Sequence, residues 1–183
     1  WVKVLFTHLR LPDGALETTL RYTREIMMAQ LPYEHAHAAA DYLDVALDML
    51  PTAPATPPGF IRPDAPLAPL AQEYLDLLLT ADRRGATRLI QNAVEAGTTV
   101  RDLYRHVFAV VQHEIGRLWQ MNRITVAQEH YVSAATQLMM SMLYPRIFTA
   151  AKHDRTVVVA CIGGELHEIG ARMVADTFEM EGW

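Results

Sequence analysis

The residues best placed to do chemistry lie near the end of the chain. An apolar run over residues 156–162 passes through Gly163 and Gly164 into Glu165-Leu166-His167-Glu168-Ile169-Gly170. The run is typical of a buried strand, and the glycine pair followed by an amphipathic pattern predicts a turn into a helix. His167 should then lie at the carboxyl edge of a parallel sheet, where α/β folds bind ligands. A neutral imidazole there could coordinate a metal through one ring nitrogen.

A second group of side chains flanks a short turn between two predicted helices. One helix ends near Trp119, and the next begins near Thr125 with Glu129 and His130 in its first two turns. A turn of this length should bring an indole, a carboxylate and an imidazole to one patch. The side chains around the pair are small and could leave room for a ligand: Ala127, Ser133, Ala134 and Ala135.

Each of these features also has a purely structural interpretation. A tryptophan near a helix end is often packing, and a Glu-His pair in a first helical turn can be solvated surface that the helix dipole favours. The chain contains its own comparison, because His113-Glu114-Ile115-Gly116 repeats the letters of residues 167–170. The first copy lies inside an amphipathic pattern and the second follows the predicted strand. Only the second is therefore placed for a cofactor.

The elements that must position these residues are mostly helical. Residues 1–50 form a helical N-terminal segment with helices predicted near 15–30 and 33–50. Residues 51–69 hold seven of the ten prolines and predict a semi-stiff linker. Residues 70–152 form a four-helix bundle, since short connections favour antiparallel neighbours. Its predicted helices are Leu70 to Thr80, Arg83 to Ala96, Thr99 to about Met121 and Thr125 to about Ala150.

The expected fold class is therefore α and α/β. The bundle would be followed, over residues 153–183, by the first strand and helix of a doubly wound, Rossmann-like domain. A lone strand and helix cannot form a stable parallel sheet. Because the chain also starts at Trp1 without a signal peptide or an initiator Met, we expect it to be a fragment of a longer protein.

Composition excludes several classes of function. The 183 residues are 51% hydrophobic and 20% charged, which is enough to build a packed core. A net charge of -5 without a helix-turn-helix or basic region argues against direct nucleic-acid binding by this segment. No apolar run is long enough to span a membrane. A single cysteine, Cys161, excludes an internal disulfide and predicts a reducing, cytoplasmic location.

Two motifs of the sequence resemble those of cobalamin-binding proteins. Glu165-x-His167-x-x-Gly170, after a strand and opening a helix, is similar to the cobalamin fingerprint Asp/Glu-x-His-x-x-Gly. Trp119, nine further residues and then Glu129-His130 resemble the Trp-x9-Glu-His signature of light-sensing cobalamin photoreceptors of the CarH type. Those proteins place a four-helix bundle directly before the cobalamin domain. The resemblance covers roughly residues 70–183.

The resemblance implies a role for each residue of the first motif. His167 would be the lower axial ligand of the cobalt of cobalamin, displacing the cofactor's own benzimidazole, and Glu165 would hold its other ring nitrogen. Gly170 would let the corrin ring approach the start of the helix. The remaining residues of the cofactor-binding motif are Leu166, Glu168 and Ile169.

On the upper face, the resemblance implies that Trp119, Glu129 and His130 pack against the 5'-deoxyadenosyl group of adenosylcobalamin. An indole stacks on adenine, and the pair can hydrogen-bond the ribose or the base. Where the best-studied relatives have a second histidine after the tryptophan, this chain has Gln120. A glutamine amide is a poor cobalt ligand, so the ligand after photolysis would be water, His130 or another histidine.

The function implied is a light-sensing regulatory protein rather than an enzyme, and no catalytic residue is assigned. Light would release the upper ligand and change the conformation or assembly of the protein, with a homo-oligomer and an output domain or regulator as partners. One alternative is a B12 photosensor coupled to a second chromophore, such as a bilin, in another domain. A second alternative is a corrinoid protein that carries methyl groups in a methyltransferase system.

Overall fold

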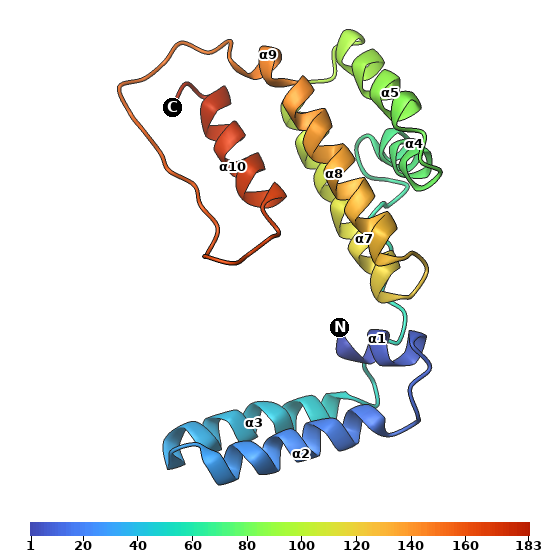
Figure 1. The fold of residues 1–183 in the computed structure, drawn as a ribbon, viewed down its shortest axis with the longest axis vertical. Helices are drawn as coiled ribbons and strands as arrows, with labels where there is room; N and C mark the ends of the chain where they lie inside the picture. Colours follow the sequence, from blue (N-terminus) through green and yellow to red (C-terminus); the bar gives the residue numbers. More distant parts are fainter. The chain divides into compact units, whose positions relative to one another are not determined.

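The computed structural model describes residues 1–183 and consists of ten α-helices and one π-helical turn (Figure 1). Its contacts divide the chain into two compact units. The first is Trp1–Pro58 with Arg117–Arg123, and the second is Gly59–Gly116 with Ile124–Trp183. None of the helices combines the length and apolarity needed to cross a bilayer. The domain limits inferred from the sequence stay a prediction.

The first unit contains a helical hairpin. Helices α2 (Ala15–Gln30) and α3 (Tyr33–Met49) lie side by side along their length (Figure 1). The Arg24 guanidinium donates to both carboxylate oxygens of Asp44, at 2.8 and 2.9 Å, and joins the two helices. The predicted helical segment is thus confirmed. The sequence pattern missed one helix, α1 (Val2–His8), which lies in the short apolar start of the chain.

The second unit contains the helices predicted for the bundle. Helix α4 contacts α5, the π-helical turn and α8. Their cores share large side chains that are fully or almost fully buried: Tyr74, Leu78, Ile90, Leu103, Phe108, Ile115, Val132 and Met139. Burial of this apolar surface is the main stabilising contribution to the unit. The bounds of its helices are α4 Ala68–Leu79, α5 Arg83–Glu95 and α8 Val126–Met142.

The turns between these helices follow the signals in the sequence. Gly97 has a φ of 98°, the left-handed conformation that glycine adopts at the end of a helix. The Thr99 hydroxyl accepts from the Asp102 N–H at the start of the next helix. Helix α8 begins with a capping box, in which Thr125 accepts from the Gln128 N–H at 3.2 Å and Gln128 accepts from the Thr125 N–H at 3.0 Å.

The helix predicted over 99–121 has a π-helical turn near its first third. The segment runs through α6 (Val100–Leu103), η1 (Tyr104–Phe108) and α7 (Ala109–Gln120). Periodicity at 3.6 residues cannot signal such a turn, which widens the helix locally. Within η1, the Tyr104 and Phe108 side chains are buried and their ring centroids lie 5.8 Å apart.

The last predicted helix of the bundle is shorter than expected. The expectation of one helix to about residue 150 is wrong, because α8 ends at Met142 and a separate turn, α9 (Tyr144–Ile147), follows. Pro145 explains the break, since proline lacks the N–H that a continuing helix needs and its ring clashes with the preceding turn.

No residue of the described chain forms a β-strand, so the expected strand over 156–162 is absent from the structure. A strand exists only when its backbone pairs with another, and no other segment offers a partner. Val158 and Ile162 of this run are exposed. The final helix, α10 (Ile169–Met180), does form, and Tyr104 on η1 donates to its buried Asp176 at 2.8 Å.

Candidate functional site

The turn before α10 holds the imidazole of His167 in a defined orientation. Glu165 Oε1 lies 2.5 Å from His167 Nδ1 and also accepts from the His167 backbone N–H at 2.7 Å. The His167 side chain is otherwise 92% exposed. Gly164 makes this turn possible with a φ of 87°, a conformation that side chains disfavour.

The protonation of this pair follows from its contacts. The His167 backbone N–H first, and then its ring nitrogen, lower the pKa of Glu165, so this carboxylate is ionised at neutral pH. A carboxylate only accepts hydrogen bonds, so the Nδ1 N–H donates to Glu165 and Nε2 points away from it. An imidazole held by a carboxylate with its other nitrogen free is the usual arrangement of a metal-ligating histidine. The residues present therefore fit the cobalt of a cobalamin.

The other residues of this motif lie in the turn before α10 and at its start. Leu166 is exposed, and Ile169 begins α10. A Cβ added at Gly170 would meet no atom within 4 Å, so the space beside this position is open. Glu168 accepts from the Gln137 side chain on α8 at 3.1 Å, which ties the motif to the bundle.

An open cavity adjoins this motif. It has a volume of about 330 Å³ and lies between the segment before the motif and the first two turns of α10. Short side chains leave the space, and Arg172 and Glu168 supply charge at its edge. The lining residues are Val159, Ala160, Cys161, Glu168, Ala171, Arg172 and Ala175.

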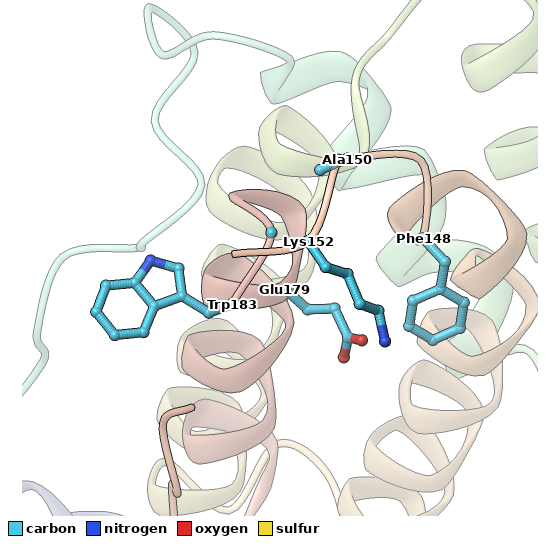
Figure 2. Close-up of a pocket in the computed structure, with 6 residues that line it drawn as sticks. Phe148, Ala150, Lys152, Glu179 and Trp183 are labelled. Carbon is cyan, nitrogen blue, oxygen red and sulfur yellow. The ribbon is translucent and has the colours of Figure 1, made fainter. Parts of the chain in front are cut away.

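A second cavity of about 230 Å³ lies near the end of α10 and contains none of the predicted site residues. Figure 2 shows the Lys152, Glu179 and Phe148 side chains on one side of it, with the Trp183 ring turned to the other. Its lining is Phe148, Ala150, Lys152, Glu179, Gly182 and Trp183.

The predicted upper-face pair lies on the first turns of α8. Glu129 Oε2 contacts His130 Nδ1, while Glu129 Oε1 lies 3.1 Å from Ser133 Oγ. The Glu129 side chain is 23% exposed and that of His130 is 75% exposed. The carboxylate is thus anchored at both oxygens beside an imidazole that faces solvent.

Trp119 belongs to the first unit, near the end of α7. Its ring centroid lies 6.4 Å from that of Trp1, with the two planes inclined by 42°. The adjacent Gln120 is buried, and its amide donates to the Trp1 carbonyl at 2.6 Å. The convergence of Trp119 with Glu129 and His130 stays a prediction from their spacing.

The first copy of the repeated tetrad has a structural role. Glu114 is buried and accepts from the Phe60 N–H at 2.8 Å, and the Phe60 ring stacks on His113 with centroids 5.2 Å apart. These contacts hold the proline-rich segment against α7. In the sequence, Gly163 and Gly164 precede the second copy, whereas no glycine turn precedes the first. This difference distinguishes the two copies.

Sequence reasoning missed the neighbours that position the predicted residues. Gln112 lies 2.9 Å from Ser133, and Thr136 lies within hydrogen-bond distance of both Gln112 and Tyr74. The sequence signal for Gln112 and Thr136 is that each is a polar residue on the predicted inward face of a helix.

A comparison with protein families gives an independent indication of the ligand. Residues 70–144 match the family model of a B12 binding domain. The match begins within α4 and ends at the first residue of α9, so it covers the helical region that precedes the histidine motif. A B12-binding domain is thus found in this chain, which supports a cobalamin-binding protein. The comparison with curated proteins gave no match.

Proposed function

We propose that this protein binds adenosylcobalamin and acts as a light sensor, with His167 as the lower axial ligand of cobalt. The observation that carries the proposal is the contact of Glu165 with His167 Nδ1, which leaves Nε2 free and exposed. The B12-binding domain at residues 70–144 supports the same cofactor from a separate part of the chain.

Bound adenosylcobalamin supplies a cobalt–carbon bond that visible light breaks. The chain's own part is to hold the two faces of the cofactor: His167 below, and Glu129 and His130 above. Glu129 accepts hydrogen bonds from ligand hydroxyls while the bond to Ser133 keeps its carboxylate in place. The spacing of the signature adds Trp119 to this face.

Without the upper group of the cofactor, Glu129 and His130 would lack the partners that this group would supply. The dark and lit states then differ in contacts made by α8, and that difference biases conformation or assembly. Gln120, buried against the Trp1 carbonyl, is not available as a replacement ligand in this arrangement.

The test is to reconstitute the protein with adenosylcobalamin in darkness and to record its absorption and hydrodynamic size before and after green light. We expect a spectrum with histidine on cobalt in the dark and a change in both spectrum and size after illumination. A spectral change at constant size would instead favour coupling to another domain, such as one that holds a bilin.

A methyl donor provides the contrasting outcome. Transfer of its methyl group to the bound cofactor in the dark, with no response to green light, would contradict the sensor and support a corrinoid methyl carrier. The same samples answer both questions, because methylated and adenosylated cobalamins have distinct absorption spectra.

A further inference from the structure

A chain of polar side chains runs from Glu129 into the core of the second unit. Ser133 Oγ lies 3.1 Å from Glu129 Oε1 and 2.9 Å from Gln112 Oε1. Gln112 Nε2 lies 3.1 Å from Thr136 Oγ1, which in turn lies 3.3 Å from the Tyr74 hydroxyl. Thr136 and Tyr74 are fully buried. The chain thus joins α8, α7 and α4.

An ionised Glu129 sets the direction of donation along these hydrogen bonds. A carboxylate only accepts, so Ser133 gives its single proton to Glu129. The Ser133 oxygen then accepts from the Gln112 amide nitrogen, and the Gln112 oxygen accepts from Thr136. This needs the Gln112 amide turned by 180°, which exchanges its nitrogen and oxygen without moving the side chain. Every donor then points toward Glu129, and bonds aligned in this way strengthen one another.

The buried end of the chain is a constant donor. Desolvation raises the pKa of Tyr74 to about 12, so its phenol stays protonated at neutral pH. The ring also packs against Phe108, with centroids 5.4 Å apart. The hydrogen-bond chain therefore starts from a fixed group in the core.

We propose that Ser133 and Gln112 are positioning residues that aim the Glu129 carboxylate at a hydroxyl-bearing group, such as the sugar diol of a nucleoside, above the cofactor. Ser133 holds one oxygen of Glu129 and His130 contacts the other. Each oxygen keeps a lone pair for a ligand, and two adjacent acceptors match two neighbouring hydroxyls. The inference rests on the proposed function, whose upper face it deepens.

The first test uses the ligand-free protein. Glu129→Gln should shift the side-chain NH₂ resonances of Gln112 in the NMR spectrum, because Ser133 then loses a charged acceptor. In a Ser133→Ala background the same change should leave those resonances in place. The proposed hydrogen-bond chain is contradicted if the Gln112 resonances do not shift, or if they still shift without the serine hydroxyl.

The second test compares affinities in darkness for adenosylcobalamin and methylcobalamin, which share the corrin and the lower face. Ser133→Ala should lower the preference for the adenosyl form about tenfold, the effect of one hydrogen bond to a charged group. Ser133→Thr keeps a hydroxyl and should restore the preference. Ser141→Ala, at the other serine of α8, is the matched control and should leave it unchanged.

The outcomes separate this inference from the proposed function. A wild-type protein that binds no cobalamin contradicts the proposed function, and the NMR experiment still decides whether Ser133 connects Glu129 to Gln112. A wild-type protein that prefers adenosylcobalamin, together with an unchanged preference in Ser133→Ala, overturns the positioning role alone.

Discussion

The same four residues, His-Glu-Ile-Gly, occur twice in this chain and reach opposite environments. In the first copy, Glu114 is only 7% exposed and Ile115 lies in the core of the second unit. In the second copy, His167 projects into solvent beside Glu165. The difference teaches that the preceding residues decide the role, since one copy continues a helix and the other follows a glycine turn.

Removal of the two histidines should give the largest contrast. His167→Ala should abolish the spectrum of histidine on cobalt and weaken cobalamin binding, because the lower ligand is lost. His113→Ala should leave both unchanged, since that ring stacks on Phe60. Absorption spectra and equilibrium titration with cobalamin measure the pair. An effect of equal size in the two variants would show that the copies do not differ in role.

Glu165→Ala should have the next largest effect. The residue that orients a metal-ligating histidine typically contributes 10 to 100-fold to metal affinity, so we expect cobalamin binding to weaken by about that factor. Asp154→Ala is the matched control, because this carboxylate is exposed and lies outside the motif. Titration of both variants tests whether the first acidic residue of the motif is the orienting one.

Glu114→Ala should act on stability instead. The Phe60 N–H loses a charged acceptor, and a hydrogen bond to a charged group contributes about 1.5–3 kcal/mol. Urea unfolding followed by circular dichroism measures the change. Glu168→Ala, in the second copy, should stay within about 0.5 kcal/mol of the wild type. If the second substitution were the more destabilising, the assignment of packing to the first copy would fail.

Alkaline pH should lower the stability of the packed helices around Tyr74, and only above the neutral range. The pKa of Tyr74 is raised from 10.0 to about 12, so the unfolded chain releases this proton first. The associated stability is complete below pH 10 and is lost as the pH rises from about 10 to about 12. Unfolding curves measured across that interval should show the loss, and Tyr74→Phe should reduce it.

The sequence predicted the helices of this fold well because their ends carry local signals. Gly97, Thr99 and Thr125 are cap residues whose effect depends on their immediate neighbours. The π-helical turn and the contact of Gln112 with Ser133 depend on packing between helices, which no local pattern encodes. The predicted strand shows the converse, since an apolar run becomes a strand only when a partner is present.

For the candidate site, as for the helices, the sequence predicted the local contacts but not the distant ones. The pairing of Glu165 with His167 was expected from the motif, and the structure brings the two together. The burial of Gln120 against the Trp1 carbonyl was not expected, because it joins residues more than a hundred positions apart. Local motifs thus indicate which residues to examine, while distant contacts decide how each is held.

The π-helical turn at Tyr104–Phe108 determines how the face of α7 responds to a change in the length of the chain. One residue of an α-helix corresponds to about 100° of rotation. A π-helical turn holds one residue more than the α-helical turn it replaces, because its hydrogen bonds span five residues instead of four. Deleting a single position within the turn would therefore leave an ordinary α-helix in which Gln112 still faces Ser133. The same deletion within α7 before Gln112 has no wide turn to absorb it and would rotate that side chain away from α8.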